Sequence, residues 1–206
     1  MSDYTYAAEN REQALEKYEW DNVWWESADS TGVPRVLYIG DSISCQTRRV
    51  ATDVAEEKIF FDGFGTSKAV DNPYFTQAIR MFAMQQGERF VVLFNNGLHG
   101  WHLDDKTAYK QHYERILQFL LEEFSNTPIV LLLTTAIADQ DRDSRVVERN
   151  RAVIELAQQY GLPVIDLYSV VRQHQEVLSE DGVHLLPEGC VVLANVLVEK
   201  VKEFLK

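Results

Sequence analysis

The sequence predicts a flavodoxin-like three-layer α/β/α sandwich, in which a five-stranded parallel sheet lies between two layers of helices. Two observations support this prediction. Short apolar runs alternate with longer segments of helical character, and each run is apolar on both faces of the strand that it would form. Strands buried on both faces occur in parallel sheets that helices cover on each side. Since the 206 residues contain no internal repeat and no long linker, one large domain is expected.

The five expected strands are short apolar runs. In chain order they are Arg35–Gly40, Lys58–Phe61, Arg89–Asn95, Pro128–Thr134 and Val164–Leu167. Runs of this length fit strands better than helices, which need about ten residues or more.

Five helices are expected between and after these strands. They cover Ser44–Glu57, Asn72–Gln86, Asp104–Phe124, Arg145–Tyr160 and Pro187–Leu205. In the third of them, apolar residues recur at intervals of three and four, which gathers them on one face. Pro73 and Pro187 stand at helix starts, where a missing N–H costs nothing, while Gly161 and Pro163 end the fourth helix.

Residues 1–33 precede the first strand, and we expect them to form a helical extension packed on the domain of residues 34–206. The helix is expected within Glu9–Trp25, a stretch rich in Trp and Tyr. Its three tryptophans fit burial against the edge of the domain better than a role in a pocket or an oligomer interface.

The chain is acidic: 20 Lys and Arg against 32 Asp and Glu give a formal net charge of −12. This charge argues against a protein that binds the nucleic-acid backbone or an anionic membrane surface, because both need clustered Lys and Arg. The longest aliphatic run, Ile129–Leu133, is far too short to span a membrane.

No signal peptide is apparent at the N-terminus, where charged residues such as Asp3 and Glu9 occur. A cytoplasmic location is therefore expected, and a secreted mature form that has lost its leader is the alternative. The two cysteines, Cys45 and Cys190, provide neither a disulfide framework nor a metal cluster.

The first expected strand ends in Gly40, Asp41 and Ser42, and ligands of open parallel sheets bind at the carboxyl ends of strands. Ser42 would lie at the start of a helix with its hydroxyl toward the cleft. Its backbone N–H, unpaired at a helix start, can point at an anion. The alternative is that Asp41 and Ser42 only cap the helix.

A second reactive pair precedes the last expected helix, where Asp181 lies three residues before His184. On a short loop, the carboxylate can accept a hydrogen bond from one imidazole nitrogen and leave the other as a base. A surface turn with an incidental histidine is the alternative. Because a serine nucleophile needs a base, and the base needs an orienting carboxylate, Ser42, His184 and Asp181 together predict a catalytic triad.

The segments Gly40–Ile43 (GDSI) and Asp181–His184 (DGVH) resemble the nucleophile block and the Asp-x-x-His block of the SGNH (GDSL-type) hydrolase family. The resemblance extends from Pro34 to the C-terminus. It implies the SGNH hydrolase fold and hydrolysis of esters through an acyl-serine intermediate, with no metal and no organic cofactor.

The resemblance also implies backbone donors for the oxyanion that forms during ester hydrolysis. The family has a glycine after its second strand, and this position corresponds best to Gly65, with Gly63 and Ser67 as alternatives. The N–H groups of Ser42 and Gly65 would then hold the oxyanion.

The third block departs from the family, because Asn95–Gly100 reads NNGLHG where the family has Gly-x-Asn-Asp. If Gly97 aligns with the family's glycine, His99 stands where the asparagine donates to the oxyanion. Asn95 and His99 rank equally as the replacement, whereas Asn96 fits a turn that ends the strand. Some group must take this place, since a missing oxyanion donor costs several kcal/mol of transition-state stabilisation.

Asp41, Gly97 and Trp101 are weaker candidates for substrate contact. Trp101 and the neighbouring His102 would form a platform for a sugar or an acyl group, and a partly buried aromatic side chain is the alternative. The acidic stretch 139–143 lacks the glycine and glutamate of a calcium loop, so we expect a solvated loop before a helix.

Taken together, these residues predict a serine esterase for small acyl esters, in particular acetyl groups on a carbohydrate. The alternative is a catalytically inactive protein of the same fold that binds a glycan or a partner through its cleft. The complete triad favours the enzyme, because a binding protein has no use for it. A neutral small-molecule or carbohydrate ester fits the acidic chain better than an anionic polymer. The sequence predicts no oligomeric state.

Overall fold

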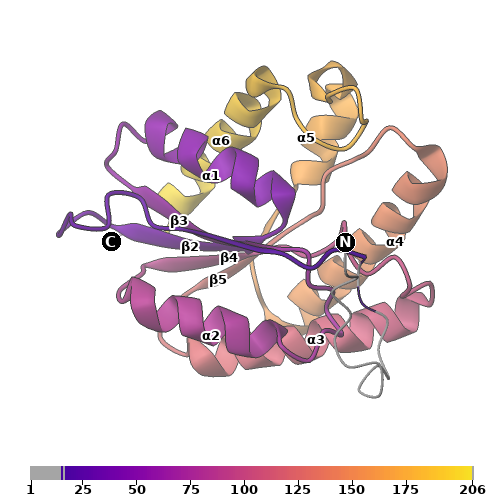
Figure 1. Ribbon diagram of the computed structural model, residues 1–206, viewed down its shortest axis with the longest axis horizontal. Coiled ribbons are helices and arrows are strands. Elements are labelled where there is room, and N and C mark those ends of the chain that lie inside the picture. The colour runs from indigo at the N-terminus through magenta and orange to yellow at the C-terminus, as the bar shows by residue number, and fades with distance from the viewer. Residues whose placement is uncertain (1–14, 16, 206) are drawn as a thin grey trace, which may run out of the picture.

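The computed structural model describes residue 15 and residues 17–205 of the chain. It contains a six-stranded sheet with the strand order β1-β3-β2-β4-β5-β6 (Figure 1). The strands are β1 (Asp21–Trp24), β2 (Arg35–Gly40), β3 (Phe60–Thr66), β4 (Val91–Phe94), β5 (Ile129–Leu132) and β6 (Val164–Ile165). The helices are α1 (Ser42–Val54), α2 (Phe75–Gln86), α3 (Lys106–Glu123), α4 (Gln140–Tyr160), α5 (Leu167–Gln173) and α6 (Pro187–Lys202), with a short 3₁₀ helix at Gln175–Val177.

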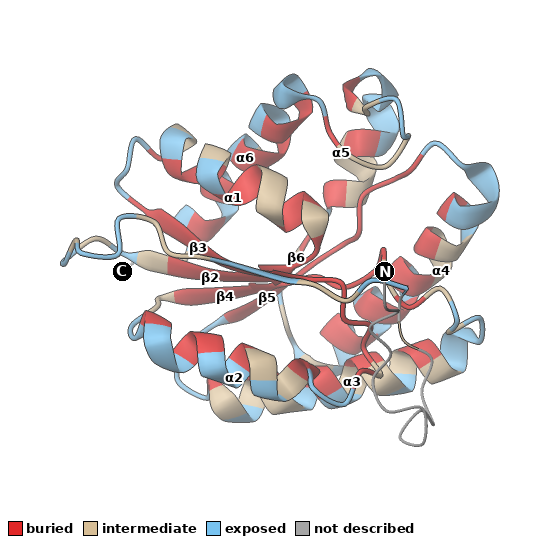
Figure 2. Cartoon of the chain, viewed as in Figure 1, coloured by how far each residue is buried: buried red, intermediate tan, exposed pale blue. Residues whose placement is uncertain are grey.

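The five strands β3, β2, β4, β5 and β6 run parallel, which confirms the predicted flavodoxin-like sandwich, while β1 adds a sixth, antiparallel strand that the sequence does not predict. Helices α1, α5 and α6 cover one face of the sheet, and α2, α3 and α4 cover the other (Figure 1). Alternate residues of β2 belong to different cores: Val36 and Tyr38 pack on the α1 side, Leu37 and Ile39 on the α2 side. The central strands and the inward faces of the helices are buried, whereas the edge strand β1 is mostly exposed (Figure 2).

Strand β3 is longer than the predicted strand over Lys58–Phe61. The glycines of β3 make this strand hard to recognise in the sequence, because glycine is uncommon inside strands. Here the glycines have a packing role: a Cβ at Gly63 would lie 2.4 Å from Cδ of Arg48, and one at Gly65 would lie 2.3 Å from Sγ of Cys45. Both contacted residues belong to α1, so the missing side chains allow this helix to pack closely on β3.

The predicted helix over Glu9–Trp25 is wrong at residues 21–24. These residues form β1, an edge strand that pairs antiparallel with residues 63–66 of β3. The hydrogen bonds of so short an edge strand come from a partner distant in sequence, which local periodicity does not reveal. Residues 9–14 and 16 lie outside the described residues, and the expected domain boundary at residue 33 stays a prediction.

Helix α4 begins at Gln140, ahead of its predicted start. Asp139 caps it, because Oδ1 accepts a hydrogen bond of 2.9 Å from the backbone N–H of Arg142. Asp141 and Asp143 therefore lie in the first turn and not in the expected solvated loop. Acidic side chains are favourable there because the helix dipole is positive at its N-terminus.

The sequence does not predict α5. This helix has seven residues and follows the two-residue strand β6, so it is too short to show helical periodicity. Its start is marked by Asp166, whose carboxylate accepts from the N–H of Ser169 at 2.8 Å. In the part of the chain that the structure describes, no helix combines the length and the apolar character needed to cross a membrane.

Candidate active site

The loop between β2 and α1 presents Ser42, the half-buried first residue of α1. Asp41 precedes the helix and caps it: its Oδ1 accepts a hydrogen bond of 3.0 Å from the backbone N–H of Ile43. Asp41 therefore caps the helix, as the alternative interpretation of this segment held for it. The N–H of Ser42 belongs to the first turn and has no acceptor within the helix.

Ser42, His184 and Asp181 form a continuous chain of hydrogen bonds. Oγ of Ser42 lies 2.9 Å from Nε2 of His184, although the two residues are 142 positions apart. Nδ1 of His184 lies 2.6 Å from Oδ2 of Asp181. The structure thus brings together the three residues that the sequence singles out, in the order serine, histidine, carboxylate that an activated serine requires.

The carboxylate of Asp181 is held in place on both of its oxygens. Oδ1 accepts from the hydroxyl of Ser179 at 2.8 Å and from the backbone N–H groups of Val183 and His184, both at 2.9 Å. The hydrogen bond from the His184 ring, followed by these backbone and hydroxyl donors, lowers the pKa of Asp181 well below its ordinary value. The group is therefore a fixed anion beside the imidazole.

Gln46 fixes the histidine loop to α1 and was not found by sequence reasoning. Its side-chain Oε1 accepts from the N–H of Leu185 at 3.1 Å, and its Nε2 donates to the carbonyl of Leu185 at 3.2 Å. Leu185 follows His184 directly, and Gln46 lies one turn beyond Ser42 on the same helix. One amide therefore ties the residue that follows His184 to the helix that begins at Ser42. Its position four residues after Ser42 is the available sequence signal.

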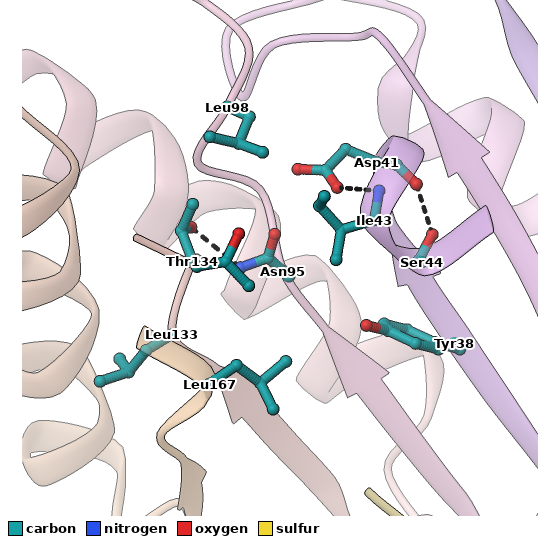
Figure 3. A pocket seen from close by; sticks show the side chains of 10 residues that line it. Tyr38, Asp41, Ile43, Ser44, Asn95, Leu98, Leu133, Thr134 and Leu167 are labelled. Atoms are coloured by element: carbon teal, nitrogen blue, oxygen red, sulfur yellow. Dashed lines mark hydrogen bonds between the residues drawn. The ribbon is translucent and has the colours of Figure 1, made fainter. Parts of the chain in front are cut away.

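Asn95 is placed beneath the site and has a structural partner for its amide. Its Nδ2 donates to the carbonyl of Leu132 at 2.9 Å and to Oγ1 of Thr134 at 3.0 Å (Figure 3). An amide nitrogen has two hydrogens, so both are used by the end of β5. The neighbouring Asn96 donates to the carbonyl of Lys68 at 2.8 Å, in agreement with the structural role expected for it.

His99 lies in the loop after β4, with its ring edge-on to Trp20 at 5.9 Å between ring centroids. It is near enough to Asp41 to favour the charged form of that carboxylate, as is His184. Burial still raises the pKa of Asp41 above its ordinary value, since its side chain is fully enclosed. Both histidines therefore stand around the start of α1.

The second carboxylate oxygen of Asp41, Oδ2, is buried without a hydrogen-bond partner. The side chain lines a small cavity of about 10 Å³, together with Leu98, Thr135 and other residues (Figure 3). Asp41 therefore faces the interior beneath the site, and its predicted contact with substrate stays a prediction.

Gly65, the expected backbone donor, lies inside β3 and not after it. It pairs with Gly40 of β2 on one side and with Asn22 of β1 on the other. Ser67, one of its alternatives, is the first residue after the strand, and its N–H donates to the carbonyl of Trp20 at 3.1 Å. The other alternative, Gly63, lies further inside the strand. A Cβ at Gly65 would lie 3.3 Å from the carbonyl oxygen of Asp41, and the role of Gly65 as a donor stays a prediction.

Strand β1 secures the loop that follows β3. Nζ of Lys68 contacts both carboxylate oxygens of Asp21, at 2.7 and 2.8 Å. Oγ1 of Thr66 donates to the same carboxylate at 2.7 Å. Together with Trp20, this strand therefore contacts the loops after β3 and β4, a role that no sequence pattern indicates.

Gly97 and Trp101, two weaker candidates for substrate contact, make packing contacts in the structure. A Cβ at Gly97 would lie 1.8 Å from Oγ1 of Thr134, so only glycine fits there. The ring of Trp101 lies under the guanidinium groups of Arg142, Arg145 and Arg149, at 5.6, 5.0 and 4.8 Å. Substrate contact by Gly97 or Trp101 stays a prediction.

His102, Cys45 and Cys190 are not part of the hydrogen-bonded chain of Ser42, His184 and Asp181. His102 pairs with Asp71 at 2.8 Å. Cys45 and Cys190 are free thiols. Among the described residues, no group of three or more His, Cys, Asp and Glu side chains is arranged to hold a metal ion.

Comparison with known proteins finds a match in structure and none in sequence. No model of a protein family matches the chain, and no curated protein is similar to it in sequence. A crystal structure of an acetyl xylan esterase superposes with a TM-score of 0.66 at 18% identity, covering 81% of this chain and 99% of the other. A GDSL-like lipase from Bacteroides thetaiotaomicron gives 0.63 at 14% identity, covering 83% and 89%.

A carbohydrate esterase of family 3 from Talaromyces cellulolyticus gives a TM-score of 0.64 at 15% identity, covering 83% of this chain and 97% of the other. The chain therefore has the fold of the SGNH (GDSL-type) hydrolases, as its motifs predict.

Proposed function

Starting from this shared fold, we propose that the protein is a serine esterase that hydrolyses small acyl esters. The observation that carries the proposal is the hydrogen-bonded chain from Ser42 through His184 to Asp181, with distances of 2.9 and 2.6 Å. A serine hydroxyl within reach of an imidazole that a carboxylate orients is the arrangement needed to make a nucleophile near neutral pH.

In the first half of the reaction, Oγ of Ser42 attacks the ester carbonyl carbon while its proton passes to Nε2 of His184. Asp181 keeps the histidine in the tautomer that can accept this proton and stabilises the imidazolium. The tetrahedral intermediate collapses when His184 gives the proton to the oxygen of the leaving alcohol. An acyl-serine and the free alcohol result.

In the second half, a water molecule attacks the acyl carbon and His184 takes its proton. The second intermediate collapses as that proton passes to Oγ of Ser42, which releases the carboxylic acid and restores the enzyme. The residues that act in the first step therefore act again in the second, in reverse order.

The negative oxygen of both intermediates needs donors fixed in advance. The N–H of Ser42 at the start of α1 is one. Gly65 is the expected second backbone donor, but it pairs with strands on both sides inside the sheet, so the second backbone donor stays unassigned. For the side-chain donor we favour His99 over Asn95. The amide hydrogens of Asn95 are directed to Leu132 and Thr134, whereas His99 lies in the loop beside the start of α1.

We assign small acyl groups, in particular acetyl groups on a neutral carbohydrate, as the substrate class. Proteins of similar structure include an acetyl xylan esterase and a carbohydrate esterase. The net charge of −12 disfavours anionic polymers as substrates, because they would be repelled from the surface.

Hydrolysis of p-nitrophenyl acetate tests the proposal. We expect a burst of nitrophenol equal to the enzyme concentration at high substrate, followed by slower turnover, because an acyl-serine accumulates. Ser42→Ala should abolish both phases, while Ser169→Ala, at a serine whose hydroxyl contacts Asp166 and not the triad, should retain the burst. Unchanged hydrolysis in Ser42→Ala refutes the assignment. Saturable glycan binding without turnover, equal in wild type and Ser42→Ala, would support the inactive binding protein instead.

A further inference from the structure

Arg149 lies on α4 and is buried, with 3% of its surface exposed. Its guanidinium group donates hydrogen bonds to three backbone carbonyls of the loop after β4. Nη1 reaches the carbonyl of Gly97 at 2.8 Å and that of His99 at 2.7 Å, and Nη2 reaches the carbonyl of Gly100 at 2.6 Å. One side chain therefore binds almost the whole backbone of the loop that carries His99.

This loop needs an external support because of its composition. Gly97 and Gly100 flank it, and glycine has more backbone freedom than any other residue. Gly100 has φ of +70°, a conformation that favours glycine. The buried guanidinium removes this freedom in the folded protein by fixing the carbonyls on both sides of Leu98 and His99.

The three hydrogen bonds also set the direction of the peptide units. In a planar trans peptide, the N–H points opposite to the carbonyl. Because the carbonyls of Gly97, His99 and Gly100 point at Arg149, the N–H groups of the following residues point away from α4. The guanidinium thus determines which face of the loop presents its backbone N–H groups.

The guanidinium is itself held rigidly. Its central carbon lies 4.8 Å from the ring centroid of Trp101 and 4.7 Å from that of Tyr109, so two aromatic rings pack against it. Tyr109 also donates from its hydroxyl to the carbonyl of Asn96, which extends the same support to the end of β4. Lysine cannot reproduce this arrangement, because an ammonium group has neither the planar fork of donors nor the stacking surface of a guanidinium.

We propose that Arg149 is a positioning residue of the active site, which acts by holding His99 at the place where the oxyanion forms. The inference rests on the proposed esterase function. Arg149 does not touch the substrate; it fixes the backbone from which the donor projects. A displacement of about 1 Å in such a donor is enough to lower the rate about 10²-fold.

The variant Arg149→Lys tests the inference, because lysine keeps the positive charge of the side chain. Arg145→Lys is the matched control. Arg145 lies one turn earlier on α4, stacks on the same tryptophan and donates to the carbonyl of Trp101 at 2.6 Å, outside the Gly97–Gly100 segment. With p-nitrophenyl acetate, we expect Arg149→Lys to lower kcat by about 10- to 100-fold while KM changes less than about threefold. Arg145→Lys should keep kcat within about twofold of wild type.

A double-mutant cycle with His99→Ala separates positioning from general support of the fold. Once the ring of His99 is removed, the side-chain donor that Arg149 is proposed to position is absent, so adding Arg149→Lys should change kcat by less than about twofold. A merely structural role would give the same loss in both backgrounds, and that result overturns the inference. An unchanged kcat in the single Arg149→Lys variant overturns it as well.

Two further measurements keep the outcome unambiguous. Far-UV circular dichroism and Tm of each variant show whether it is folded, and Arg149→Gln serves as the second variant if the lysine variant does not fold. Loss of hydrolysis in Ser42→Ala together with full activity in the folded Arg149 variants refutes the role of Arg149 alone. Retained hydrolysis in Ser42→Ala refutes the esterase proposal itself.

Discussion

At the scale of single residues, Asp181 has a different task on each of its carboxylate oxygens. One oxygen contacts the imidazole of His184, and the other accepts hydrogen bonds from a hydroxyl and two backbone N–H groups. Both tasks favour the anion, and they account for the lowered pKa of this group. The same residue therefore orients the base and stabilises the turn that carries it.

Asp181→Asn should separate these two tasks. An amide nitrogen facing Nδ1 of His184 favours the wrong tautomer, so Nε2 can no longer accept the proton of Ser42, and kcat should fall about 10³-fold or more. Glu180→Gln, at the exposed neighbouring carboxylate, should keep wild-type kcat. Steady-state hydrolysis of p-nitrophenyl acetate measures both, and a loss under tenfold in Asp181→Asn contradicts a triad role.

The lowered pKa of Asp181 also predicts how stability depends on pH. Because the folded state favours the carboxylate, its contribution is present above the ordinary pKa of about 4 and is lost as the pH falls below it. The difference in Tm between wild type and Asp181→Asn should therefore be largest at neutral pH and shrink below about pH 4. The effect is modest, since 52% of the side chain is exposed to solvent. A difference that grows on acidification would contradict the assigned direction.

At the scale of elements, the close approach of α1 to β3 determines where Ser42 lies. The sequence predicts β2, β4 and β5 well, because a strand covered on both sides is apolar throughout. It predicts β1 and the second half of β3 poorly. These segments contain polar residues and glycines whose roles depend on contact with α1 or with each other, and such contacts have no local pattern.

Gly65→Ala tests this packing. Its new Cβ would lie 2.3 Å from Sγ of Cys45, so we expect a loss of about 1–3 kcal/mol in the free energy of unfolding, measured with urea. Cys45→Ala should restore part of that loss in the double variant, because it removes the contacted sulfur atom. If Gly65→Ala is as stable as wild type, the helix does not pack on the strand as closely as described.

Some residues of the candidate site can likewise be predicted from the sequence, and others cannot. Ser42, Asp181 and His184 can be predicted because their residue types and the short sequence motifs that contain them indicate a nucleophile, an orienting carboxylate and a base. Gln46 and Arg149 cannot, since an amide or a guanidinium acquires its role only when the fold brings a distant backbone segment to it. The choice between Asn95 and His99 as the proposed side-chain donor likewise depends on packing, because the amide of Asn95 donates to Leu132 and Thr134 at the end of β5.

At the scale of the whole molecule, the net charge of −12 is compatible with the proposed function, because hydrolysis of a neutral ester needs no charged substrate. We expect kcat/KM for a neutral acetate ester to change less than about twofold between 20 and 500 mM NaCl. For an anionic ester, such as mono-p-nitrophenyl succinate, kcat/KM should rise with salt, because salt screens the repulsion between substrate and enzyme. A fall in kcat/KM for the anionic ester would indicate a local positive field at the site.

The position of the triad along the chain has a consequence for biosynthesis. Ser42 begins the first helix of the parallel sandwich, whereas His184 directly precedes the last, and these two helices lie side by side on one face of the sheet (Figure 1). A nascent polypeptide still on the ribosome therefore exposes the serine long before its base has been translated. If the proposed function holds, Ser42 stays unactivated until the chain up to His184 has been made and folded against α1, so a chain that ends before residue 184 is expected to have no hydrolytic activity.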